Sequence, residues 1–291
     1  MLALVRDTLR SFSRHGGTLL GGALAFFALL SAVPMFVIAL DIAGRLTSEH
    51  AARTELIRGI RSWMGKDGAH TISTLLDQVH ITASGSFERT LGTIVLAYGA
   101  TRLFTQTQRA LNHMWDVTAR PVADMPGRIV RVIRKRLLAF SMVIVCALFL
   151  LASVLIRALM LGVSDAVGAD LPRQWHVLDH VISFVVSTSL FAAVFRLLPD
   201  VKIQWRDALA GAVCTSVLFA LGKLVIARYL AHKAGTSVFG VAGSIVMLLL
   251  WVHYTAQIFF LGAAFTAVFA ERAGRPLLPT PDALRVSVEP V

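Results

Sequence analysis

Charged residues are scarce in this chain. Asp, Glu, Lys and Arg make up 15% of its 291 residues, whereas apolar residues make up 56%. A soluble domain carries about a quarter charged residues and has no place to bury so much apolar surface. The composition therefore speaks against a soluble protein and favours one whose solvent is the lipid bilayer.

Cysteine is scarcer still. The chain has two, Cys146 and Cys214, and both lie within long apolar runs. We interpret them as small buried hydrophobic residues, because they form no pattern of a disulfide framework. A phosphate-binding glycine loop is also absent from the sequence, so pumping driven directly by ATP would require another subunit.

Long apolar runs are what the chain has instead. A spanning helix needs about 20 mostly apolar residues, and six stretches qualify. They are Thr18–Ala43, Leu91–Phe104, Leu137–Leu161, Val177–Leu198, Ala208–Leu230 and Val241–Ala270. The sequence therefore predicts an all-α fold, a polytopic membrane bundle of about six transmembrane helices with short amphipathic helices beside it.

The basic residues predict the orientation of these helices. The net charge is +11, from 28 Lys and Arg against 17 Asp and Glu. In a soluble protein such an excess suggests nucleic acid, but here most basic residues fall in alternate loops, as in the positive-inside pattern. The densest block, RIVRVIRKR, lies in the loop 116–136. We expect both termini in the cytoplasm, a multi-pass protein of the bacterial inner membrane, membrane lipids as partners and no nucleic acid.

The expected organisation is one six-span domain over residues 1–275. An outer segment, 45–89, mixes apolar and charged positions at helical spacing and predicts surface amphipathic helices. The basic loop 116–136 lies on the cytoplasmic side. The proline-punctuated tail 276–291 is expected to be disordered.

Four blocks along the chain resemble those of a known family. The blocks are AFFALLSAVP, TRLFTQTQRALNHMWDV, FRLLPDVKIQWRDALAGA and FGVAGSIVMLLLWVHYTAQIFFLGA. Their matching positions are Ala25, Phe26, Ser31, Pro34, Leu111, Asn112, Trp115, Leu198, Pro199, Trp205, Arg206, Asp207, Ala208, Gly211, Gly240, Gly243, Ser244, Trp251, Leu261, Gly262 and Ala263. In this order they resemble the YihY/BrkB membrane proteins, once described as ribonuclease BN.

The resemblance implies six inner-membrane helices rather than a defined activity. Two positions depart from the family pattern. Phe27 stands where the family commonly has Tyr, which removes a hydroxyl, and Ala264 stands where many members have Glu. A role that depends on that carboxylate does not carry over to this chain.

Polar residues within the apolar runs are the candidate substrate-binding residues, because ionisable groups are costly inside a bilayer. Arg102, Gln106 and Arg109 are spaced by four and three, which places them on one helical face. The other candidates are Lys223, His253 and Gln257. The alternatives are arginines that reach the headgroups and a His–Gln pair that only bonds neighbouring helices.

A second set is expected to shape or gate the bundle. Pro34 would kink the first span, and Ser31 is placed to bond the freed backbone. The full set is Ser31, Pro34, Asn112, Trp115, Pro199, Asp207, Gly240, Gly243 and Trp251.

The leading hypothesis is a protein that transports or flips an amphiphilic or anionic solute, such as a lipid, a lipid headgroup or an organic phosphate. The alternative is a membrane scaffold that docks an envelope-assembly partner through residues 45–89. A ribonuclease is the weakest hypothesis, because the acidic residues of the loops lack metal-ligand spacing. We therefore expect no enzyme, no cofactor and no metal, and the spacing of His176 and His180 is a weak metal signal. An oligomer is compatible with the sequence.

Overall fold

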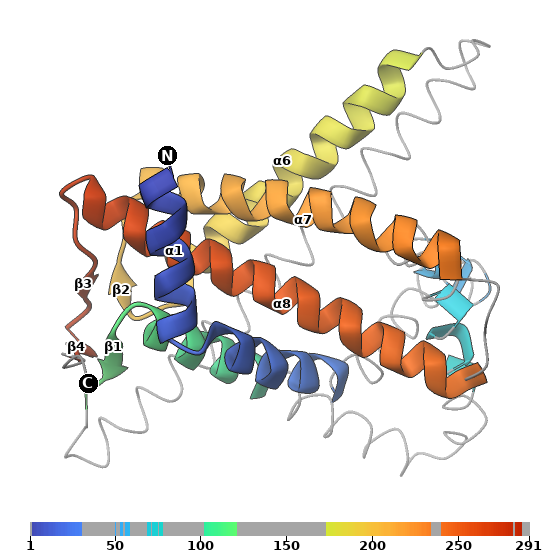
Figure 1. The fold of residues 1–291 in the computed structure, drawn as a ribbon, viewed down its shortest axis with the longest axis horizontal. Helices are drawn as coiled ribbons and strands as arrows, with labels where there is room; N and C mark the ends of the chain where they lie inside the picture. The colour runs from blue at the N-terminus through green and yellow to red at the C-terminus, as the bar shows by residue number, and fades with distance from the viewer. Residues whose placement is uncertain are drawn as a thin grey trace. The chain divides into compact units, whose positions relative to one another are not determined.

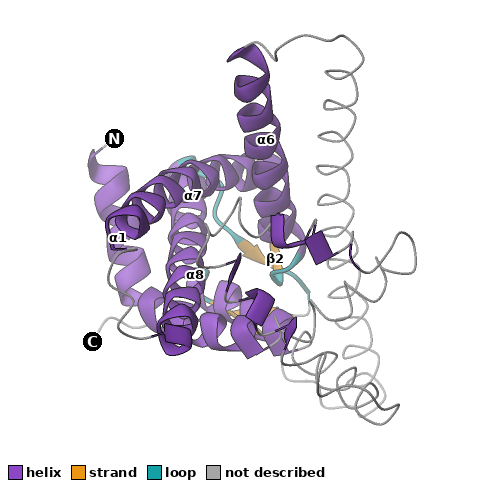
Figure 2. Ribbon diagram, turned by 90° about the vertical axis from the view of Figure 1, so that its right-hand side faces the viewer, coloured by secondary structure: helices purple, strands orange, loops and turns teal. Residues whose placement is uncertain are grey.

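The computed structural model describes residues 2–30, 50, 53–54, 56–58, 69–70, 72–74, 76–77, 102–120, 173–233, 240–281 and 283–286. Most of these residues are helical (Figure 2). The chain divides into two compact units. Unit 1 contains residues 1–15, 108–218 and 260–291, and unit 2 contains residues 16–107 and 219–259.

Three long helices follow the last three apolar runs of the sequence (Figure 1). They are α6 (Arg173–Leu197), α7 (Trp205–Lys233) and α8 (Gly240–Arg272). The predicted runs end within a few residues of these bounds, so the helices at these three positions are confirmed. The run Leu137–Leu161 and the basic block of the loop 116–136 lie outside the described residues.

Local chemistry explains where these helices end. Pro199 follows α6 and cannot continue a helix. Asp207 in the first turn of α7 places a carboxylate at the positive end of the helix dipole. After α8, Gly274 has a φ of 69°, Arg275 N donates to Ala270 O, and Gly274 N donates to Glu271 O. This is a Schellman motif, which needs a left-handed residue at that position.

Among the described residues, one helical segment is both long and apolar enough to cross a membrane: Leu248–Arg272, which is 25 residues of α8. Shorter apolar helices are Gly17–Leu30 and Ser183–Leu197. Helix α7 carries an exposed apolar row at helical spacing, formed in order by Leu209, Val213, Val217, Leu221 and Leu224. Six spans and their orientation stay predictions.

The described residues of unit 1 also form four short strands in two antiparallel pairs. Strand β1 (Val117–Ala119) pairs with β4 (Ala283–Arg285), and β2 (Val201–Lys202) pairs with β3 (Leu278–Pro279). The tail was expected to be disordered from residue 276. The described tail residues instead form β3 and β4, because the main chain after residues 116 and 200 offers them edges: Val286 N donates to Asp116 O, and Thr280 N donates to Asp200 O.

Within unit 1, α7 and α8 approach closely through a reciprocal pair of contacts. A Cβ added at Gly211 would overlap Thr266, and one added at Gly262 would overlap Thr215. Each threonine hydroxyl donates to the glycine carbonyl four residues earlier on its own helix, at 2.7 Å for Thr215 and 2.8 Å for Thr266. On each helix the glycine and the threonine are four residues apart. Small residues at this spacing let two helix backbones touch, as in membrane helix pairs.

Unit 2 has its own apolar core. It consists of Ala69, Ile72, Leu76 and Leu248, with Leu29, Leu56, Ile57 and Val252 packed against it. The described residues between 50 and 77 are helical, as the spacing in the segment 45–89 predicts, and Leu56, Ile72 and Leu76 lie in or against this core. The outer segment therefore packs against α8 through those positions.

Candidate functional site

The helix formed by residues 102–114 has two different faces. Arg102 and Arg109 are exposed and Gln106 is half-buried. The residues of the buried face are Gln108, Leu111, Asn112 and Trp115. The predicted arginine stripe thus lies on the exposed side, and a second polar row, of which only Asn112 was predicted, as a structural or gating residue, is turned into unit 1.

This buried row holds the carboxylate of Asp200. Asn112 Nδ2 donates to Asp200 Oδ2 at 2.9 Å, Asp200 N donates to Asn112 Oδ1 at 2.9 Å, and Gln108 Nε2 donates to Oδ1 at 3.3 Å. All three side chains are at least nine-tenths buried. The bonds join the helix 102–114 to the turn after Pro199, which is itself buried. Sequence reasoning missed Gln108 and Asp200, although the spacing of four between Gln108 and Asn112 was visible.

Trp115 closes the same helix against α8. Its Nε1 donates to the carbonyl of Ala263 at 2.9 Å, and its ring lies edge-on to Phe195 with 6.4 Å between centroids. A buried indole normally finds such an acceptor for its N–H. Asn112 and Trp115 are therefore both structural in their contacts.

Asp207 is buried and ion-paired at the start of α7. Arg275 Nη2 donates to Asp207 Oδ1 at 2.6 Å and Nε donates to Oδ2 at 3.1 Å, a bidentate pair. The hydrogen bond to this carboxylate raises the pKa of Arg275 above its ordinary value. The Schellman motif after α8 places Arg275 at this position, so the pair ties the end of α8 to the start of α7.

In unit 2, His253 and Gln257 form a pair on α8. Gln257 Nε2 lies 2.5 Å from His253 Nε2, one helical turn away, and both side chains are half-buried. A Cβ on Gly21 would lie 3.2 Å from Gln257 Cγ, and a Cβ on Gly22 would lie 3.8 Å from His253 Cε1. Two consecutive glycines of the helix Gly17–Leu30 therefore face this polar pair.

The remaining predicted residues lie along α8 or outside the residues that the structure describes. Trp251 is half-buried, and its ring lies 6.3 Å from that of Phe219. Gly240 begins α8, and Gly243 lies in its first turns. Ser31, Pro34 and the side chain of Lys223 lie outside the described residues.

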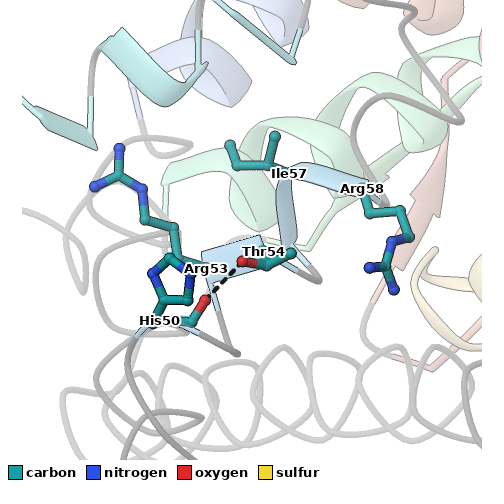
Figure 3. A pocket seen from close by; sticks show the side chains of 5 residues that line it. All are labelled: His50, Arg53, Thr54, Ile57 and Arg58. Carbon is teal, nitrogen blue, oxygen red and sulfur yellow. Dashed lines mark hydrogen bonds between the residues drawn. The ribbon is translucent and has the colours of Figure 1, made fainter.

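A cavity in the outer segment of unit 2 has a basic lining. It measures about 470 Å³, and the described residues that line it are His50, Arg53, Thr54, Ile57 and Arg58. Figure 3 shows the two guanidinium groups pointing away from each other, and the Thr54 hydroxyl donating to the His50 carbonyl at 2.8 Å. Arg53 donates to Ser73 Oγ at 3.2 Å and to Asp77. In the part of the chain that the structure describes, no group of three or more His, Cys, Asp or Glu is arranged to hold a metal ion.

Comparison with protein families shows to which family the chain belongs. The profile of the family described as virulence factor BrkB matches residues 8–285. The chain belongs to this family. The resemblance indicated by the four sequence blocks is confirmed.

Several curated BrkB relatives carry the name UPF0761 membrane protein. One from Nitrosospira multiformis is 23% identical over 94% of this chain and 62% of its own length. One from Janthinobacterium is 25% identical over 84% of this chain and 54% of its own length, and one from Vibrio vulnificus is 25% identical over 93% and 83%. The chain thus spans less than two thirds of the first two relatives. No solved structure matches it.

These relatives are named membrane proteins and come from bacteria, which supports an integral membrane protein for the BrkB chain. Three of the four blocks that carry the family resemblance meet in unit 1, through the Asn112–Asp200 and Trp115–Ala263 bonds. Ala264, where many members have Glu, is fully buried next to that carbonyl. A carboxylate at this position would lie within unit 1, away from water.

Proposed function

We propose that this protein moves an amphiphilic or anionic solute, such as a lipid, a lipid headgroup or an organic phosphate, through the bacterial inner membrane. In this proposal it has six spans with both termini in the cytoplasm, and it needs no catalytic step, cofactor or metal. The observation that carries the proposal is the His253–Gln257 pair on the apolar helix α8. Ionisable groups at such depth are functional candidates by default.

The contacts of this pair support a binding role. His253 and Gln257 bond each other within one helix, so a ligand can replace that bond without separating two helices. The helix Gly17–Leu30 packs closely against the pair through Gly21 and Gly22, since a Cβ on Gly21 would lie 3.2 Å from Gln257 Cγ. Arg102, Gln106 and Lys223 belong to the same unit and would contribute positive charge and hydrogen bonds toward an anionic group.

The test measures flux in liposomes. Wild-type protein is reconstituted with a fluorescent phosphatidylglycerol, whose movement between leaflets is followed by dithionite quenching. A parallel preparation measures uptake of glycerol phosphate. We expect movement of at least one probe, and we expect its loss in His253→Leu, Gln257→Leu, Arg102→Ala and Lys223→Ala. The matched control is Thr255→Val, because the Thr255 hydroxyl donates to Trp251 O within α8 and the substitution keeps the shape of the side chain.

Two outcomes would contradict the proposal. One is the absence of flux for both probes in the wild-type protein. The other is wild-type flux in all four variants, with each protein monodisperse after purification. Loss of flux in Thr255→Val as well would show that the assay reports the packing of α8 rather than a binding site.

A second function is supported by the outer segment. On the segment expected outside the membrane, the cavity is lined by the exposed guanidinium group of Arg58, as a scaffold for an acidic envelope partner would require, while Arg53 bonds Asp77 and Ser73. Photo-crosslinking from position 54 in cells tests it. A specific protein adduct that disappears in Arg58→Glu favours the scaffold, and transport requires no such adduct.

A further inference from the structure

The helix α1 (Leu2–Arg14) presents an apolar row on its exposed side. Leu2, Val5 and Leu9 are spaced by three and four, and they are 89%, 55% and 52% exposed. Residues at this spacing form one continuous stripe on a helix. Large apolar side chains grouped in this way mark a surface that another apolar phase covers.

A basic row runs beside this stripe. Arg6, Arg10 and Arg14 follow each other at a spacing of four, and all three are exposed. The third side of the helix is turned into unit 1, where Thr8 and His15 are buried. An apolar stripe, a basic row and a fixed inner side are the features of a helix that lies in a membrane interface.

Two contacts fix how α1 is turned. Asp7 accepts a hydrogen bond from Arg272 at the end of α8, and His15 Nε2 lies 2.9 Å from Asp116 Oδ1. His15 Nδ1 also lies 2.7 Å from the Ser11 carbonyl. With α1 held at its middle and at its C-terminal end, the apolar and basic rows have a definite direction.

The contact with Arg272 also indicates how deep α1 lies relative to the membrane surface. Arg272 ends the segment Leu248–Arg272, which is long and apolar enough to cross a bilayer. Figure 1 shows α1 beside this end of α8. The end of a span, marked by an arginine, lies at the headgroup layer. The exposed apolar row of α1 is therefore at the level where acyl chains begin.

We propose that α1 is an interfacial helix whose apolar row enters the bilayer surface and whose Arg6, Arg10 and Arg14 bind the headgroups of anionic lipids. Charge complementarity and the depth set by Arg272 favour lipid over a protein partner as the occupant of this surface. The surface is separate from the His253–Gln257 pair, and it holds whether or not the protein moves a solute.

Depth measurements in nanodiscs test the apolar row. The full chain, with Cys146→Ser and Cys214→Ser, receives a spin label at Leu9→Cys or at Ala3→Cys, an exposed position on the basic side. We expect the label at position 9 to be more accessible to oxygen than to a water-soluble nickel chelate, and the label at position 3 to show the reverse. Val5→Cys repeats the measurement if Leu9→Cys does not fold.

Results of two kinds would overturn the proposal. Preference of the nickel chelate at position 9 means that the row faces water. Low accessibility to both reagents means that a protein covers it. The second kind concerns charge. In bilayers of mixed phosphatidylcholine and phosphatidylglycerol, the wild-type protein should preferentially immobilise phosphatidylglycerol, and Arg10→Gln should weaken this preference by up to about fivefold. An unchanged preference in the Arg6, Arg10 and Arg14 triple Gln variant, or an equal loss in the control Arg285→Gln, contradicts headgroup binding.

Discussion

In unit 1, buried polar side chains bond across elements that are far apart in the sequence, whereas in unit 2 the pair His253 and Gln257 bonds within one helix. The bond between Asn112 and Asp200 joins residues 88 positions apart, and that between Asp207 and Arg275 joins residues 68 apart. The bonds between distant elements of unit 1 hold the fold together, and their polar groups are already paired with each other. A contact within one helix can be exchanged for a ligand at little cost to the fold.

Most of the predicted substrate-binding residues belong to unit 2, whereas the predicted structural residues belong to both units. Of the predicted substrate-binding residues, Arg102, Gln106, Lys223, His253 and Gln257 belong to unit 2 and Arg109 to unit 1. The predicted structural residues of unit 1 are Asn112, Trp115, Pro199 and Asp207. If the comparison holds, substitutions in unit 1 should reduce stability, and substitutions of the His–Gln pair should reduce flux.

The largest effect is expected at the contact between α7 and α8 in unit 1. In Gly211→Ala the new Cβ overlaps Thr266, whose hydroxyl is bonded to its own helix. We expect the free energy of unfolding to fall by about 3 kcal/mol, the upper end for overpacking. Denaturation in mixed micelles, followed by circular dichroism, measures it.

Two further variants sharpen this result. Gly22→Ala in unit 2 meets His253 only at 3.8 Å, an ordinary contact, so it should leave stability unchanged or raise it by up to about 1 kcal/mol through helix propensity. Thr266→Ala should restore part of the stability lost in Gly211→Ala. Equal losses at Gly211 and Gly22, with no rescue, would mean that the loss reflects glycine removal in general.

The second prediction concerns the carboxylate of Asp200. In Asn112→Leu, this buried group loses the partner that both donates to its Oδ2 and accepts from its backbone N–H. We expect a loss of about 2 to 3 kcal/mol, the cost of an unpaired buried polar group. Arg109→Leu, an exposed change on the same helix, should stay within about 0.5 kcal/mol. If the Asn112→Leu protein is stable but shows no flux, then Asn112 serves function rather than stability. The contrast between a structural unit 1 and a functional unit 2 would then be wrong.

The sequence predicted the helices of this protein better than the partners of its polar residues. Apolar runs located α6, α7 and α8 to within a few residues, because a long run of apolar residues and the residues that end it are both visible in the sequence. Helical spacing also identified the face that carries Arg102 and Arg109. It gave no sign that the opposite face, with Gln108 and Asn112, would meet Asp200, since a bond across 88 residues depends on tertiary packing.

The tail 276–291 is a second place where the sequence does not predict a tertiary partner. Its prolines and polar residues predicted disorder, but Leu278–Pro279 and Ala283–Arg285 pair with strands that follow distant helices. A two- or three-residue strand has no pattern of its own and forms only where a partner edge is supplied. Likewise the basic residues of α1 were interpreted as an orientation signal, while its separate apolar row becomes visible only with burial.

A third prediction tests unit 2 directly. In His253→Leu the bond to Gln257 is lost, but both residues stay on one helix. Polar contacts within membrane proteins contribute about 0.6 kcal/mol on average, so we expect stability to change by less than about 1 kcal/mol. Measured in the same micelles, a loss as large as that of Asn112→Leu would show that the pair is structural and would remove the basis for a binding site there.

The smallest effect is expected at the exposed edge of unit 1, where Arg272 donates to Asp7. This hydrogen bond holds the pKa of Asp7 below its usual 3.8. Because the folded-state pKa is the lower one, the stabilisation is complete above that usual value and is lost as the pH falls through the folded-state pKa. Asp7→Asn should therefore lower the Tm slightly at neutral pH, less so in high salt, and the two proteins should melt together in strong acid. A difference that persists in acid would mean that the substitution disturbs the seating of α1 itself, and the depth labels at positions 3 and 9 would then shift together.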